Sequence, residues 1–110
     1  MPQTAIQKIV AAYRLEQGNG NGKPLPYREF ADVLKAGIPH LSNLTFQAVA
    51  NWETGANDPA IETLIYIFSM TDKGDWRRDF AADLMAAKLP SNWLPQGSIG
   101  KRILKETTQE

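Results

Sequence analysis

Two side-chain carboxamides lie four residues apart in a stretch that has the pattern of a short helix. Gln47 and Asn51 belong to residues 44–55, L-T-F-Q-A-V-A-N-W-E-T-G. At helical spacing they share one side with Ala50 and Thr54. A carboxamide donates and accepts hydrogen bonds at once, which matches the N6 and N7 atoms of adenine, and an alanine leaves room for close approach. The pattern predicts a helix that enters the major groove of DNA.

The same stretch carries the signals that begin, anchor and end a helix. Thr45 is a favourable N-cap because its hydroxyl can accept a hydrogen bond from a backbone N–H of the first turn. Gly55 can adopt the left-handed conformation that ends a helix. An apolar stripe lies on another side: Ala48, Val49 and Trp52. We therefore expect a helix over residues 45–54 that is anchored by its tryptophan and presents its amide side outward.

This stretch resembles the recognition helix of the lambda-repressor-like (Cro/cI, or XRE-type) helix-turn-helix family. That family often carries the pattern [VI]-S-x-x-T-[IV]-S-x-W-E-x-G, and the matching residues here are Leu44, Thr45, Val49, Ala50, Trp52, Glu53 and Gly55. The segments P-Y-R-E-F-A-D-V-L at 26–34 and D-P-A-I-E-T-L at 58–64 extend the match, which covers residues 4–70. The resemblance implies an all-α, five-helix lambda-repressor-like bundle with a helix-turn-helix, acting as a sequence-specific transcriptional regulator.

The resemblance also implies which residues would contact a DNA duplex. The predicted DNA-binding residues are Tyr27, Arg28, Thr45, Phe46, Gln47, Ala50, Asn51, Thr54 and Asn57. Gln47 and Asn51 would read base edges, and Phe46 would either pack on a thymine methyl group or lie under the preceding loop. Four of the others match positions that often touch phosphates, to which they can donate hydrogen bonds without charge: Tyr27, Thr45, Thr54 and Asn57. The alternative interpretation of the two amides is that they are solvated polar side chains on a surface helix.

Two features depart from the family pattern. The segment 36–43, A-G-I-P-H-L-S-N, is longer than the turn of a few residues that usually precedes the recognition helix. It could tilt that helix or lie against the DNA backbone. Family members frequently carry Arg or Lys near residues 54–58, and this chain has none there. Glu53 is expected to cap or pair locally.

The charge of the chain argues against strong attraction to phosphates. Twelve cations balance twelve carboxylates, so the formal net charge is zero. Residues 45–83 hold three cations against seven carboxylates. Because phosphate contacts supply much of the affinity of DNA-binding proteins, a second hypothesis stays open. The chain could be a protein-interaction module on a helix-turn-helix scaffold, with weak or no DNA binding.

Two helices are predicted before the recognition helix from apolar side chains at helical spacing. The first begins at a capping box, with Thr4 as N-cap and Gln7 reaching back, and ends near Gly18. A flexible link over residues 17–24 separates it from the second helix, whose first turn contains Pro26. The apolar stripes of the two helices are Ile6, Ile9, Val10 and Tyr13, and then Tyr27, Phe30, Ala31 and Leu34.

Two more helices are predicted after it. Asn57 or Asp58 is expected to cap the fourth helix, with Pro59 at its first position, and Asp75 is expected to cap the fifth. The fourth helix is apolar on so much of its surface that it is either central or in contact with a second chain. The stripes are Ile61, Leu64, Ile65 and Phe68, widened by Tyr66, Ile67 and Met70, and then Trp76, Phe80, Leu84 and Ala87.

We expect a helix-turn-helix domain over residues 1–90 and a C-terminal extension over residues 91–110. Trp93 and Leu94 are expected to pack the extension on the domain, because an exposed tryptophan is costly, and a short last helix precedes a frayed end. The tail carries cations that could touch an acidic partner or the DNA backbone: Lys101, Arg102 and Lys105. Family members commonly act as dimers, and a homodimer would use the fifth helix or the extension.

Other chemistry is only weakly indicated. The chain has no cysteine, which excludes a disulfide or a thiol nucleophile. Asp75, Asp79 and Asp83 recur every four residues and are expected to form a solvated face rather than a metal site. The only histidine, His40, has no partner in a motif, and the glycine-rich link does not have the spacing of a phosphate-binding loop. We expect no enzymatic activity, no metal and no cofactor.

The expected location follows from hydropathy. No apolar stretch approaches the length of a membrane span, and the first residues lack a basic region followed by an apolar run. We therefore expect a cytoplasmic protein with no membrane partner, whose partner is double-stranded DNA.

Overall fold

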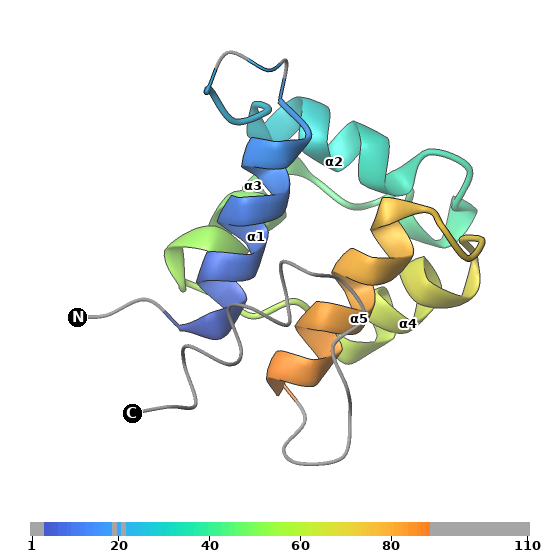
Figure 1. Ribbon diagram of the computed structural model, residues 1–110. Coiled ribbons are helices and arrows are strands. Elements are labelled where there is room, and N and C mark those ends of the chain that lie inside the picture. Colours follow the sequence, from blue (N-terminus) through green and yellow to red (C-terminus); the bar gives the residue numbers. More distant parts are fainter. Residues whose placement is uncertain (1–3, 19, 21, 89–110) are drawn as a thin grey trace.

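The computed structural model describes residues 4–18, 20 and 22–88, and this part of the chain is all-helical (Figure 1). Its elements are α1 (Ala5–Glu16), α2 (Tyr27–Lys35), the short 3-10 helix η1 (Pro39–Leu41), α3 (Phe46–Thr54), α4 (Ile61–Ser69) and α5 (Trp76–Lys88). For these residues the expected all-α class with five main helices is confirmed. The predicted extension over 91–110, including Trp93 and Leu94, lies outside the described residues.

An aromatic cluster joins the two ends of the chain's described part. Tyr13 of α1, Phe30 of α2, and Trp76 and Phe80 of α5 lie with neighbouring ring centroids 5.2 to 6.2 Å apart. Edge-to-face and offset pairs of this kind stabilise a fold beyond the burial of their area. α4 and α5 lie side by side, and α3 packs against α1 and α2 (Figure 1). The cluster therefore holds α1, α2 and α5 together, and α3 packs on the first two of these helices.

The local signals at the ends of α1 and α3 are confirmed. Gln7 N donates to the Thr4 hydroxyl, and Thr4 N donates to the Gln7 side chain, which completes the capping box. Ala48 N donates to the Thr45 hydroxyl at 3.2 Å, and Gly55 ends α3 with a φ of 87°. Each of these caps depends on residues within four positions of one another, so tertiary packing has little influence on where the two helices begin or end.

The start of α4 differs from the prediction. The helix begins at Ile61, its N-cap is Ala60, and no side chain caps it. Pro59 is fully buried. The proline ring is used as a core side chain, so the chain runs on for one residue beyond it before the helix begins. The predicted stripe also changes, because Ile67 is buried with Leu64 whereas half of Ile65 is exposed.

The predicted solvated face of α5 is wrong at Asp83. This carboxylate is fully buried, and the Tyr13 hydroxyl donates to it at 2.6 Å. Burial, followed by the hydrogen bond to Asp83, raises the pKa of Tyr13 well above its ordinary value. The carboxylate of Asp75 accepts hydrogen bonds from the guanidinium and from the backbone N–H of Arg77, and the second of these is expected of a helix cap. A buried tyrosine partner seventy residues away gives no signal in the local spacing.

The long turn between α2 and α3 is a folded element. After Gly37, at a φ of 76°, residues 39–41 form η1, and Ile38 and Leu41 are buried. The ring of His40 stacks on Tyr66 of α4 with centroids 4.3 Å apart. The insertion therefore packs on α4 as well as bridging α2 and α3. No helix within residues 4–88 is both long and apolar enough to cross a membrane.

Candidate nucleic-acid interface

The two sides of α3 have different environments. Val49 and Trp52 are buried in the core, while Gln47 and Thr54 are exposed and Asn51 is partly exposed. The side that carries the carboxamides faces away from the core. That orientation leaves their polar edges open to a ligand, and contact with DNA stays a prediction.

The two carboxamides are tied to each other. Gln47 Nε2 donates to Asn51 Oδ1 at 3.1 Å, one helical turn along. This bond uses one donor and one acceptor site. Each amide keeps further donor and acceptor capacity. The pair therefore presents a fixed, mixed hydrogen-bonding edge of the kind that fits a base edge in a groove.

The hydroxyls at the two ends of α3 are engaged in different ways. The Thr45 hydroxyl accepts a hydrogen bond from Ala48 N, so its own proton can still be donated, for example to a phosphate oxygen. The Thr54 hydroxyl donates a hydrogen bond to Asn51 O at 3.4 Å. Asn57 is exposed just beyond α3, and its backbone N–H also donates to Asn51 O.

The sequence suggested that Glu53 caps or pairs locally, but the structure shows that its carboxylate joins three helices. Arg14 of α1 donates to both carboxylate oxygens, from Nε at 2.8 Å and from Nη2 at 3.0 Å. The Tyr27 hydroxyl at the start of α2 donates to Glu53 at 2.9 Å. The guanidinium also lies 4.1 Å from the centroid of the Tyr27 ring and donates to Leu25 O. We call Arg14, Tyr27 and Glu53 the clamp.

The clamp has an electrostatic consequence. Burial alone would raise the pKa of Glu53, but the hydrogen bonds from Arg14 and Tyr27 outweigh it and lower that pKa. The side chains of Glu53 and Arg14 are only 15% and 11% exposed. Glu53 is the one charged residue of α3, so the helix brings no unpaired carboxylate to its exposed side.

The predicted site residues on α2 separate into two groups. The Tyr27 hydroxyl donates a hydrogen bond to Glu53, so its predicted phosphate contact would require that hydrogen bond to break. Arg28 is exposed, and its guanidinium lies 5.0 Å from the centroid of the Phe46 ring. Phe46 is 43% exposed, and it is the first residue of α3. It lies next to α2, and the inserted loop leaves much of its ring uncovered.

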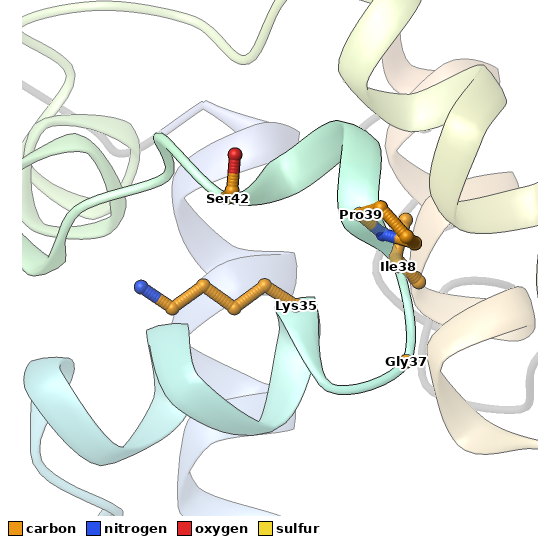
Figure 2. A pocket seen from close by; sticks show the side chains of 5 residues that line it. All are labelled: Lys35, Gly37, Ile38, Pro39 and Ser42. Atoms are coloured by element: carbon orange, nitrogen blue, oxygen red, sulfur yellow. The ribbon is translucent and has the colours of Figure 1, made fainter.

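An open hollow of about 450 Å³ lies between the end of α2 and η1, and it is lined by Lys35, Gly37, Ile38, Pro39 and Ser42. Figure 2 shows Lys35 extending away from Ile38 and Pro39. Its ammonium group donates to Leu44 O at 3.1 Å, so the lysine braces the chain that enters α3.

Sequence reasoning missed Arg14 and Lys35. Both act across gaps in the chain, since Arg14 lies 39 residues from Glu53 and Lys35 lies 9 from Leu44. The sequence does hold one signal for such a partner. Glu53 follows a tryptophan that is expected to be buried, and a buried charge needs a partner of opposite charge. Comparison of the chain with protein-family models, curated proteins and solved structures finds no match.

Proposed function

We propose that the chain binds double-stranded DNA sequence-specifically through α3 and acts as a transcriptional regulator. In this proposal α2 and α3 form a helix-turn-helix of the lambda-repressor-like type. α3 lies in the major groove with its N-terminal residues at the base edges, and α2 crosses the backbone. The proposal places the protein in the cytoplasm and assigns it no catalytic activity and no cofactor.

One observation carries the proposal. The exposed side of α3 bears a hydrogen-bonded carboxamide pair, Gln47 and Asn51, while the only carboxylate of the helix is neutralised by Arg14 on another side. A carboxylate at the exposed side would repel phosphates, and its neutralisation removes that cost. The small side chain of Ala50 between the amides permits close approach to bases.

The test is selection of bound sequences from a randomised duplex library, followed by affinity measurements on the enriched site. The double variant Gln47→Ala and Asn51→Ala should lose discrimination at two base positions, because a good bidentate contact is worth about 1–3 kcal/mol. The control is Gln17→Ala, which removes a side-chain amide at the C-cap of α1. It should leave the selected sequence unchanged. An unchanged sequence preference in the double variant would remove the base-readout claim.

A second candidate function is protein interaction, and the surface of α4 favours it. Ile65 is 50% exposed and Tyr66 is 37% exposed, and Met70, the C-cap of the helix, is 47% exposed. Exposed apolar groups gathered on one helix are typical of interaction surfaces. This candidate would replace the first if the selection enriches no sequence.

The homodimer is also a proposal. A single short helix reads few base pairs, and two copies on a near-palindromic site would double the readout. Sedimentation of the free protein and of its complex with the selected duplex tests it. Two protomers on a two-fold-symmetric site support the dimer, and one protomer on an asymmetric site opposes it.

A further inference from the structure

Arg28 differs from the other arginines in the described part of the chain. Arg14 donates to Glu53 and to Leu25 O, Arg77 donates to Asp75 and to carbonyls at the end of α2, and Arg78 donates to Phe68 O and Thr71 O. Within residues 4–88, no carboxylate or carbonyl oxygen accepts a hydrogen bond from the guanidinium of Arg28. Its planar set of five donors is therefore open to a ligand.

Phe46 holds that guanidinium in place. The distance of 5.0 Å between Arg28 Cζ and the ring centroid lies within the range of a cation–π contact. The ring itself is 43% exposed at the first position of α3. A cation at an aromatic ring loses fewer conformations on binding than a free arginine would, because its position is already restricted.

We propose that Arg28 and Phe46 together read a guanine and a neighbouring thymine. Arg28 donates two hydrogen bonds to O6 and N7 of a guanine, and the Phe46 ring packs on the C5-methyl group of a thymine next to it. This inference rests on the proposed function and adds to it two specificity-determining residues beside the carboxamide pair.

The geometry favours bases over phosphates for this pair. The N-terminal residues of a recognition helix are those that meet base edges, and Phe46 is the first residue of α3. An apolar ring gains nothing from a phosphate but does pack on a thymine methyl group. Successive bases are stacked about 3.4 Å apart, so a guanidinium held next to the ring reaches the neighbouring base. Guanine is the base whose two acceptors match the guanidinium fork.

The experiment uses the full chain and the duplex that it selects. The expected selected site contains a thymine next to a guanine, and two modified duplexes separate the two contacts. In one, 7-deazaguanine replaces the guanine and removes N7; in the other, deoxyuridine replaces the thymine and removes only the methyl group. The parent protein should lose affinity for each by about fivefold or more, the lower end expected for a specific base contact.

Two variants assign these losses to residues. Arg28→Met keeps an unbranched side chain but has no hydrogen-bond donor, so it should no longer distinguish guanine from 7-deazaguanine while keeping its response to deoxyuridine. Phe46→Ala should no longer distinguish thymine from deoxyuridine. Circular dichroism of both variants checks that the helices are retained.

The possible failures are distinguishable. If the parent protein selects no sequence, both the proposed function and this inference are overturned. If it selects a site that depends on Gln47 and Asn51 but Arg28→Met responds to the modified guanine as the parent does, only the inference fails. An equal loss of affinity of Arg28→Gln for every duplex, with no change in base preference, would show that Arg28 binds phosphate and would also overturn it.

Discussion

At the scale of single residues, Glu53 links the fold to the proposed interface. Its carboxylate lies between Arg14 and Tyr27, so one side chain holds α3 to both α1 and α2. Truncating one partner of a buried pair leaves the other charge without compensation, which costs more than the pair contributes. The orientation of the carboxamides relative to α2 therefore depends on a residue that does not face them.

Glu53→Gln should lower the stability of the protein at neutral pH and change its acid response. The pKa of Glu53 is lowered below its ordinary value of 4.5, so the carboxylate stabilises the fold above that value. That contribution is lost as the pH falls through the lowered pKa of the folded state. We expect the free energy of unfolding at pH 7 to fall by about 1–3 kcal/mol, as for a lost hydrogen bond to a charged group.

Urea unfolding at pH 7 and at several values below 4.5 checks this prediction. The parent protein should lose stability over the acid range, while the variant should lose less because the shifted carboxylate is absent. Glu62→Gln, on the exposed part of α4, controls for the removal of one negative charge. Parallel acid profiles of the parent protein and Glu53→Gln would contradict the role given to the clamp.

At the scale of elements, the end of α3 is held against the start of α1. Gly55 has a φ of 87°, and a Cβ atom there would lie 2.8 Å from Gln7 Nε2. Gln7 is the residue that completes the capping box of α1. The C-terminal end of α3 and the N-terminal end of α1 therefore constrain each other.

Gly55→Ala should destabilise the protein more than Gly74→Ala does. Both glycines have positive φ, so both substitutions incur the cost of about 1–2 kcal/mol for an L-residue in a left-handed conformation. Gly74, at a φ of 100°, has nothing near its Cβ position, so it reports this cost alone. The excess at Gly55 measures the displacement of Gln7. Thermal unfolding of the two variants gives the comparison, and equal losses would contradict the mutual constraint.

The elements also show what the sequence could and could not predict. The limits of α3 followed from Thr45 and Gly55 because caps act through neighbouring backbone groups. The start of α4 did not, since the burial of Pro59 depends on the core around it.

The same limit applies to the candidate site. The exposed side of α3 could be predicted from the spacing of Gln47 and Asn51, since an anchored helix has one buried side. The partners of Glu53 and Asp83 could not, because Arg14 and Tyr13 meet them only after α1 has packed on α3 and α5. Local periodicity carries no information on which distant side chain satisfies a buried charge.

At the scale of the whole molecule, charge sets the kind of DNA binding that the proposal allows. The chain is formally neutral, and three of the arginines within residues 4–88 are bonded to the protein's own oxygens. Near the start of α3, Lys35 is also engaged, with Leu44 O. Near α3, few cations of the described residues are left for phosphates, so base contacts and uncharged donors such as Thr45 must supply a large share of the affinity.

This balance predicts a weak salt dependence. If each protomer neutralises no more than about three phosphates, the slope of log K against log salt concentration should be no steeper than about −3 per protomer. Fluorescence anisotropy on the selected duplex across a series of salt concentrations measures it, and Lys73→Gln, in the turn before α5, should leave it unchanged. A slope twice as steep would contradict an interface confined to α2 and α3. In that case Lys101→Gln with Lys105→Gln, two tail cations outside the described residues, should make the slope shallower by about 2, because each lost phosphate contact reduces it by about 0.9.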